Sequence, residues 1–251
     1  MPNLILDRMS WTEVKENLKN IKIALIPAGS SEQHGPHLPM QVDTACATVV
    51  AGAVGELVFP KALVTTPIPI GVSYHHMKFP GTLTVDEDTM MGIVYNVCWS
   101  LKQHGISNAL IVNGHKGNTN SLMIATRKIT DELGVKSLSV DYWEYFPKEK
   151  KDMLGDKIVP GHGSEFETSI VMYHDEQLVR KGFHRTFKPD KSFTDEYFRP
   201  RTYLGMKKLF ESSEDGLTLG DPSGASKSKG EALVKIIASE IANLATREFN
   251  L

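Results

Sequence analysis

The densest group of side chains able to do chemistry lies in residues 31–39, which read S-E-Q-H-G-P-H-L-P, with Asp43 soon after. Glu32 and His34 are two residues apart, so in an extended segment both side chains point the same way. Asp43 stands at the start of the next predicted helix and can return to the same volume. A carboxylate can bridge two cations, and nitrogen and oxygen ligands of this kind suit Zn, Mn or Fe. The segment therefore predicts a metal site, in preference to a polar surface loop with incidental histidines.

A second group, N-G-H-K-G-N, occupies residues 113–118 between a predicted strand and a predicted helix. Its glycines permit sharp turns and a close approach of the backbone. A phosphate site at the helix N-terminus is one interpretation, but the sequence lacks the G-x-x-x-x-G-K-[ST] pattern of such loops. His115 as a metal ligand fits better. Lys116 either contacts an anionic substrate or is simply solvated.

A third group, G-H-G-S-E-F-E-T-S, occupies residues 161–169. Glutamates at the start of a helix are often favourable partners of the helix dipole. That interpretation accounts for one glutamate, and it accounts less well for His162, Glu165 and Glu167 occurring together. The group is therefore a further candidate for chemistry.

A smaller group, S-Y-H-H at residues 73–76, precedes the turn signal F-P-G-T at residues 79–82. His75 and His76 are candidates for binding a substrate, and Ser73 is a further candidate. The alternative is that these histidines lie on the surface.

The elements that must position these groups alternate between strand and helix patterns. Strands are predicted at residues 21–28, 62–70, 109–112 and 136–142, and helices near 10–20, 43–58, 86–105, 119–134, 165–174 and 227–249. Such alternation predicts one α/β domain, spanning residues 1–251, with a mainly parallel sheet between layers of helices. Sites in these folds form beyond the carboxyl ends of strands. The loops that start at Gly29 and Asn113 lie there.

Two stretches have weaker patterns. Pro67 and Pro69 predict that the strand in residues 62–70 ends early or lies at an edge of the sheet. Residues 180–224 have the least pattern in the chain, and they are candidates to cover a pocket or to form a subunit contact.

Composition narrows the function classes. The formal net charge is −2 and no basic block occurs, which argues against nucleic acid or an anionic membrane as partner. No apolar run reaches the roughly 18 residues of a membrane helix, and residues 1–10 show no secretion signal. Cys46 and Cys98 lie in apolar, helix-like segments and are predicted to be buried free thiols. A cytoplasmic location is the expectation.

Together with the F-P-G-T turn, the three groups resemble the creatininase (creatinine amidohydrolase) family. The matched stretches run in the family's order from about residue 25 to residue 169, and beyond them only the length and a closing helix agree. The resemblance implies a three-layer α/β/α fold and a binuclear metal site. Glu32, Asp43 and His115 would hold one ion. His34, the bridging Asp43 and one further carboxylate would hold the other.

The source of that further carboxylate departs from the family pattern. In creatininases proper it lies two residues after the histidine of Asn-Gly-His, and that position here is Gly117. Many relatives supply it from the later segment instead. We therefore assign it to Glu165, with Glu167 as the alternative. A tyrosine expected beside His115 is Lys116 here, and both changes argue against creatinine itself as substrate.

The resemblance implies hydrolysis of a non-peptide C–N bond, in a cyclic amide or a formamide, by a hydroxide that two divalent metal ions activate. Zn is the favoured metal, with Mn or Fe as alternatives. Because an imidazole titrates near neutral pH, His162 is the candidate that passes a proton to the leaving nitrogen. Glu167 would orient His162 or only cap the helix. The resemblance also implies a small-molecule substrate and a homo-oligomer, a hexamer.

Other activities remain open. One is hydrolysis of a cyclic diketone of the keto-inositol type, and another is deformylation of a formamido-pyrimidine nucleotide. A different class is a catalytically inactive metal-binding or assembly protein, but a structural zinc site normally has four ligands and does not pair two ions.

Overall fold

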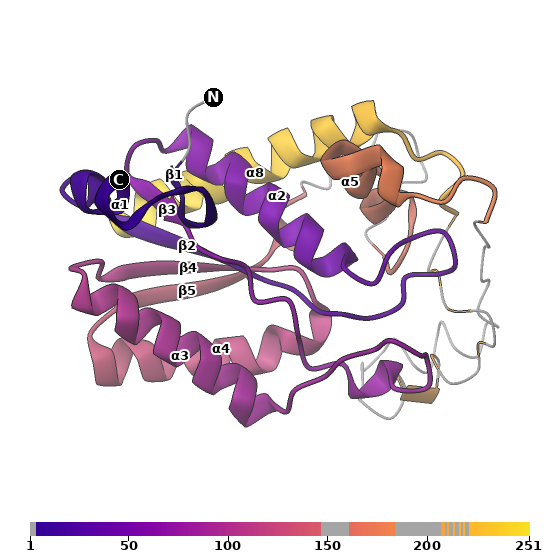
Figure 1. The fold of residues 1–251 in the computed structure, drawn as a ribbon, viewed down its shortest axis with the longest axis horizontal. Coiled ribbons are helices and arrows are strands. Elements are labelled where there is room, and N and C mark those ends of the chain that lie inside the picture. Colours follow the sequence, from indigo (N-terminus) through magenta and orange to yellow (C-terminus); the bar gives the residue numbers. More distant parts are fainter. Residues whose placement is uncertain are drawn as a thin grey trace.

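The computed structural model describes residues 4–146, 161–183 and 221–251, together with residues 207, 208, 210, 213, 216 and 218. In these residues five parallel strands form one sheet in the order β1-β3-β2-β4-β5 (Figure 1). The strands are β1 (Leu4–Ile5), β2 (Ile23–Ala28), β3 (Ala62–Val64), β4 (Asn108–Asn113) and β5 (Lys136–Asp141). The α-helices are α1 (Trp11–Asn17), α2 (Val42–Leu57), α3 (Glu87–Gln103), α4 (Thr119–Lys128), α5 (Glu165–Asp175) and α8 (Lys227–Phe249).

Helices cover both faces of this sheet. Figure 1 shows α2, α5 and α8 on one face and α3 and α4 on the other. Ile23 and Leu25 of β2 belong to the core under α2, α5 and α8, whereas Ala24 and Ile26 belong to the core under α3 and α4. Successive side chains of a strand point to opposite faces, so a strand covered on both sides reads as a continuous apolar run. The predicted three-layer α/β/α architecture is confirmed.

Most helix ends follow the sequence signals. Ser10 forms a capping box with Glu13 at the start of α1, and Asp86 accepts a hydrogen bond from the Thr89 amide at the start of α3. After α4 the chain continues as a π-helical turn, Ile129–Leu133. That turn ends at Gly134, whose φ of +63° suits glycine. The capping residues therefore fix where these helices begin and end.

The strand predicted at residues 62–70 ends early, at Val64. Pro67 and Pro69 cannot donate to a strand ladder, and beyond Val64 only an isolated bridge joins Ile68 to Ala28. The strand does not lie at an edge, because β3 pairs with both β1 and β2. β1 was not predicted, since a strand of two residues is too short to produce a periodic pattern.

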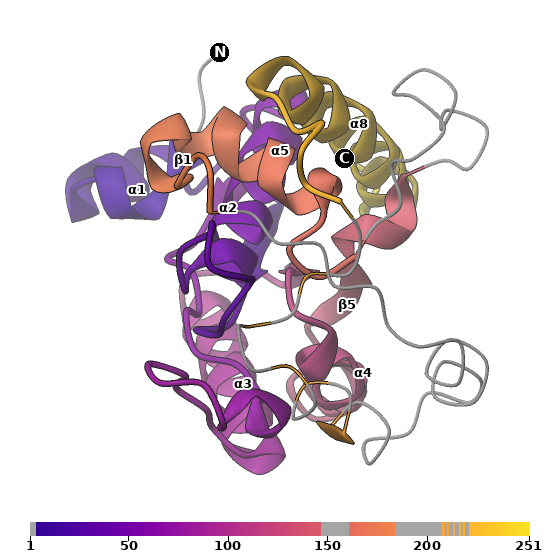
Figure 2. The same cartoon turned by 90° about the vertical axis from the view of Figure 1, so that its right-hand side faces the viewer.

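The sheet brings the two predicted loops together. β2 and β4 are neighbours in register, with Ala28 opposite Asn113 at their carboxyl ends. The loop that carries Glu32 and His34 follows β2, and the loop that carries His115 follows β4. Figure 2 views the molecule from this end of the sheet. Neighbouring parallel strands therefore place segments 80 residues apart in the sequence around one volume.

Other predictions meet the structure as follows. Cys46 and Cys98 are buried and free, as predicted. Most of residues 180–224 lie outside the described residues, as does the segment 147–160. None of the helices in the described part of the chain is both long and apolar enough to span a bilayer.

Helices α5 and α8 pack closely at Gly230, where a Cβ atom would overlap the main-chain carbonyl of Ser169. We expect Gly230→Ala to destabilise the fold by about 1–3 kcal/mol, because the backbones must separate to relieve this overlap. Gly92 of α3 is the matched control, since a Cβ atom there meets nothing within 4 Å. Gly92→Ala should stabilise by about 0.5–1 kcal/mol through helix propensity. Urea unfolding of both variants tests this, and equal midpoints would contradict it.

Candidate metal centre

Five acidic and imidazole side chains converge at the carboxyl end of the sheet. Glu32 and His34 come from the loop after β2, Asp43 from the first turn of α2, His115 from the loop after β4, and Glu167 from the first turn of α5. The first four are at most 3% exposed, and the Glu167 side chain is 12% exposed. Charged groups buried this deeply must be paired with one another or with a cation.

The Asp43 carboxylate lies between two imidazoles. One of its oxygens, Oδ1, is 2.9 Å from His34 Nε2, and Oδ2 is 3.0 Å from His115 Nδ1. Glu32 Oε1 is 3.3 Å from the same nitrogen of His115, and Glu167 Oε2 is 3.7 Å from His34 Nε2. The cluster thus has two halves that share Asp43: Glu32 with His115, and Glu167 with His34.

Main-chain carbonyls fix the orientation of both imidazoles. His34 Nδ1 is 3.2 Å from the Glu32 carbonyl, and His115 Nε2 is 3.0 Å from the Val72 carbonyl. A carbonyl oxygen only accepts, so each of these nitrogens carries the proton of a neutral ring. The opposite nitrogen faces the Asp43 carboxylate, and it offers a lone pair there once it has lost its proton. Metal-binding histidines are commonly oriented in this way, by a hydrogen bond from the nitrogen that does not bind the ion.

Buried atoms without hydrogen bonds support a cation at this position. Within the described part of the chain, His34 Nε2 and Asp43 Oδ2 are buried and make no hydrogen bond. Nearly all buried polar atoms in proteins have a partner. Ligand atoms of Glu32, His34 and Asp43 all lie within 4.8 Å of one another. These residues therefore fit a divalent ion, which the lone pairs and the carboxylate oxygens would hold.

The pKa values of the cluster residues also indicate that positive charge is favoured at this position. Burial lowers the pKa of His34, but the carboxylates of Asp43, Glu167 and Glu32 together outweigh burial and raise this pKa to about 9. Burial likewise opposes a proton on His115, and Glu32 and Asp43 raise the pKa of His115 well above its usual value. Burial, with the nearby negative charge of Asp43, raises the pKa of Glu167 to about 7. Without a metal ion, protons on His34 and His115 balance the negative charge of the carboxylates.

The structure does not bring Glu165 to this cluster. Its carboxylate forms an ion pair with Lys229 of α8, and Lys229 also donates to the Gly224 carbonyl at 2.7 Å. Glu165 and Glu167 are two residues apart on α5, so their side chains are about 200° apart around the helix. With Glu165 directed at α8, Glu167 faces His34. The predicted ligand Glu165 therefore lies away from the cluster, and Glu167, the alternative, lies in it.

Gly117 has no room for a side chain. A Cβ atom there would overlap the Val72 carbonyl and the His115 ring. The carboxylate that creatininases proper place at this position cannot be accommodated on this backbone. The further carboxylate of the cluster therefore comes from another segment, and Glu167 of α5 supplies it.

His162 lies against the cluster, with its ring stacked on His34 at 4.0 Å between centroids. Its Nε2 donates to the Gln33 carbonyl at 2.6 Å, which leaves Nδ1 facing Glu32 Oε1 at 3.8 Å. Burial lowers the pKa of His162 well below its usual value, with a further contribution from His34. His162 is therefore neutral at rest, with a lone pair on Nδ1, and can first accept a proton.

The structure gives different surroundings to three of the predicted substrate-binding residues, Ser73, His75 and Lys116. Ser73 is fully buried, and its Oγ lies 2.5 Å from Ser30 Oγ and 3.2 Å from His115 Nε2. His75 stacks on His115 at 5.6 Å between ring centroids. Lys116 is half-exposed and lies 3.4 Å from Asp141. Ser73 thus contacts the His115 nitrogen that faces away from Asp43. His75 lies beside the cluster, and Lys116 lies at its exposed edge.

Two further residues lie near the cluster, His76, which was a candidate for binding a substrate, and Phe210, which was not predicted. His76 is fully buried, and its Nε2 is 3.2 Å from Glu32 Oε1. Phe210 is 2% exposed, and its ring centroid is 4.0 Å from that of His76 and 5.1 Å from that of His162. The S-Y-H-H segment contained a signal for His76. Phe210 comes from the stretch without a pattern, where no signal could have identified it.

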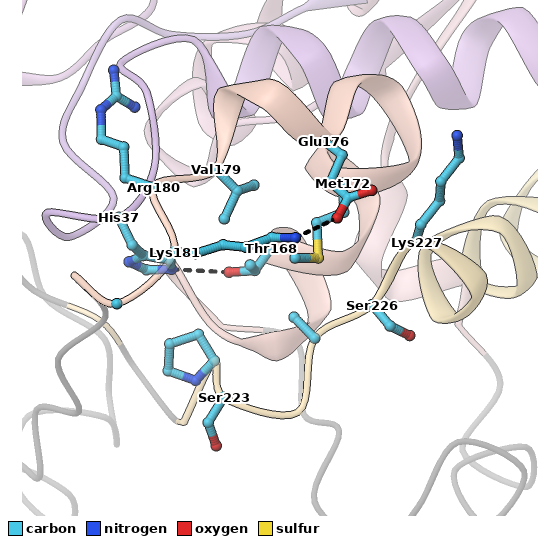
Figure 3. A pocket seen from close by; sticks show the side chains of 13 residues that line it. His37, Thr168, Met172, Glu176, Val179, Arg180, Lys181, Ser223, Ser226 and Lys227 are labelled. Carbon is cyan, nitrogen blue, oxygen red and sulfur yellow. Dashed lines mark hydrogen bonds and ion pairs between the residues drawn. The ribbon is translucent and has the colours of Figure 1, made fainter.

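A separate pocket of about 380 Å³ lies beside the start of α5 (Figure 3). His37 and Thr168 meet there with 3.0 Å between His37 Nε2 and Thr168 Oγ1, and Lys181 pairs with Glu176 at 2.7 Å. None of the cluster residues lines this pocket. The His37–Thr168 contact joins the loop that carries His34 to the helix that carries Glu167.

Comparison with known proteins identifies relatives of this chain. The chain is 29% identical over 227 residues to the mycofactocin precursor peptide peptidase of Mycolicibacterium smegmatis, covering 85% of this chain and 80% of that protein. It is 26% identical over 269 residues to the creatinine amidohydrolase of Pseudomonas putida, covering 98% of each. It is 30% identical over 169 residues to the 3-dehydro-scyllo-inosose hydrolase of Thermotoga maritima, covering 64% of this chain and 53% of that protein.

Solved structures agree with the sequence comparison. A mutant creatininase described as Zn-Zn type superposes with a TM-score of 0.80 and 25% identity, and the match covers all of both chains. The family profile described as creatininase, creatinine amidohydrolase, matches residues 7–245. This chain belongs to the creatininase family of metal-dependent amidohydrolases.

Proposed function

We propose that this member of the family is a binuclear metal-dependent hydrolase that cleaves a non-peptide C–N bond, in a cyclic amide or a formamide. The observation that carries the proposal is the position of Asp43, whose two carboxylate oxygens each face the lone-pair nitrogen of a different histidine. One ion would satisfy only half of this arrangement. Two ions sharing Asp43 would satisfy both halves.

The ligand set follows from the two halves of the cluster. Glu32, Asp43 and His115 would hold one ion, and His34, Asp43 and Glu167 would hold the other. Zn is the favoured metal, because imidazole and carboxylate ligands suit it and a similar creatininase is described as Zn-Zn type. When bound, two such ions supply a water of lowered pKa and a positive charge that polarises a carbonyl.

His162 would move the proton in this reaction. Nδ1 is the free nitrogen of a neutral ring, because Nε2 is held by the Gln33 carbonyl. It can accept a proton from the attacking water and return it to the leaving nitrogen, so the ring ends neutral as it began. The Phe210 ring, packed on His162 and His76, would exclude bulk water from this step.

Other substrates stay within the proposal as alternatives. The similar enzyme of Thermotoga maritima is named as a hydrolase of a keto-inositol, and the similar enzyme of Mycolicibacterium smegmatis is named as a peptidase. A compound panel should therefore contain cyclic amides, formamides, formamido-pyrimidines, cyclic ketones and short peptides. The family resemblance implies that the protein forms a homo-oligomer, a hexamer, and this stays a prediction.

The first prediction concerns the ligand from α5. Glu167→Gln should reduce bound metal from about two ions per chain to about one, because it removes a carboxylate from the half that contains His34. Glu165→Gln is the matched control on the same helix and should retain about two. Metal analysis after reconstitution and dialysis measures both. Loss of metal from the Glu165 variant alone would return the assignment to Glu165.

Metal binding should release protons. In the metal-free protein the pKa of His34 is about 9, so at pH 7 its Nε2 carries a proton that must leave before the nitrogen can bind an ion. Affinity should therefore rise with pH up to about 9 and then level off. Calorimetric titration at pH 7 in two buffers of different ionisation enthalpy counts the protons. Release of none would contradict this account of the cluster.

Turnover should depend on His162. With any compound of the panel that the wild type hydrolyses, His162→Asn should lower kcat by about 10²–10⁴-fold, since a general acid-base residue contributes that much. Metal content and thermal stability should stay unchanged. If metal is lost together with activity, His162 is a ligand. If the wild type hydrolyses none of the panel while binding two ions, the inactive binding protein becomes the better description.

A further inference from the structure

His76 is a buried side chain that the proposed reaction does not yet use. It sits at the end of a 3₁₀ turn, Tyr74–His76, and its backbone is fixed because its carbonyl accepts from the Thr82 hydroxyl at 3.0 Å and from the Phe79 amide at 2.9 Å. Its exposed fraction is zero. Among the described residues, its Nε2 makes no hydrogen bond. A buried ring atom without a partner calls for a functional explanation.

Gln33 determines which ring nitrogen of His76 carries the proton. The Gln33 amide is oriented by the Gly35 N–H, which donates to Gln33 Oε1 at 2.9 Å. Its Nε2 therefore presents N–H groups, and it lies 3.3 Å from His76 Nδ1. A nitrogen that accepts a hydrogen bond must offer a lone pair. The proton of the neutral His76 ring is consequently on Nε2.

The Nε2 atom of His76 lies beside Glu32, one of the proposed metal ligands. His76 Nε2 is 3.2 Å from Glu32 Oε1 without forming a hydrogen bond to it. The ring contacts both His162, at 4.9 Å between centroids, and Phe210, at 4.0 Å. A protonated Nε2 has no lone pair for a metal ion. It is a fixed donor on the Phe210 side of the cluster, beside the proton-carrying His162.

We propose that His76 is a catalytic residue whose Nε2–H donates a hydrogen bond to the substrate carbonyl oxygen as that oxygen gains negative charge during attack by water. The proton stays on His76, and no bond of the ring forms or breaks. Donors already in position before the reaction stabilise such an oxyanion without reorganisation. This inference rests on the proposed hydrolytic function and adds to it the residue that recognises the carbonyl oxygen.

The tautomer can be measured without a substrate. Long-range proton–nitrogen correlation spectra of the full chain labelled with ¹⁵N-histidine resolve the two ring nitrogens of each imidazole. His76→Gln identifies the His76 signals by their loss. We expect a neutral ring protonated on Nε2, with and without Zn. A ring protonated on Nδ1, or one whose Nε2 shifts as a metal ligand when Zn is added, would overturn the proposal.

The donor role can be measured with acetohydroxamate, whose carbonyl oxygen is a probe for this N–H. Its dissociation constant for the Zn-loaded protein should rise about tenfold in His76→Leu, which removes the donor, and less in His76→Gln, whose amide N–H partly replaces it. With a hydrolysed panel compound, kcat should fall by about 10²–10³-fold in the Leu variant. His104→Leu, at an exposed position after α3, is the control and should match the wild type.

Three results separate the possible failures. If His76→Leu binds two Zn ions and matches the wild type in acetohydroxamate affinity and kcat, the proposal is wrong. If His76→Leu and His76→Gln lose metal, His76 supports a ligand and is not a donor to substrate. If the wild type itself binds neither Zn nor acetohydroxamate, the proposed hydrolytic function fails, irrespective of His76.

Discussion

The whole site depends on one buried carboxylate placed between two imidazoles that cannot turn away from it. The rings of His34 and His115 are each held from behind by a main-chain carbonyl, so their free nitrogens must face Asp43. In water such an arrangement would relax. Here the closely packed interior prevents it, and the resulting excess of negative charge must be balanced by protons or by metal ions. The other two residues of the cluster, Glu32 and Glu167, add to the negative charge that must be balanced.

The fold supplies this constraint through strand order. β2 and β4 are adjacent and parallel, so the loops that follow them emerge at the same edge of the sheet. The first turn of α2 brings Asp43 to the same edge, because α2 begins where the loop after β2 ends. α5 completes the site from the side, where Gly163 donates to Glu167 at 2.6 Å and holds its carboxylate toward His34. The proposed ligands thus lie in loops after strands or in the first turns of helices, where a side chain can be fixed without interrupting the sheet.

Much of this could be predicted from the sequence. The strands before residues 29 and 113, the helix that begins near Asp43, and the gathering of Glu32, His34, Asp43 and His115 all follow from local patterns and from the rule for parallel sheets. The choice between Glu165 and Glu167 could not be made from composition, since both are glutamates at a helix start. It depends on which side of α5 faces α8. That side is known only from the folded structure, in which Glu165 pairs with Lys229 of α8. Phe210 follows no periodic pattern, so its place over the histidines is a tertiary result.

The proposed metal ligands come from separate segments between residues 32 and 167, and this dispersal has a thermodynamic consequence. An unfolded chain does not hold these side chains together, so under the proposed function the native state would bind the ions, whereas the unfolded state has no comparable site. Occupancy is then linked to folding by mass action, and each tenfold increase in free metal above the dissociation constant adds about 1.4 kcal/mol to stability for each site. The amount of folded protein in a cell would accordingly follow the supply of metal.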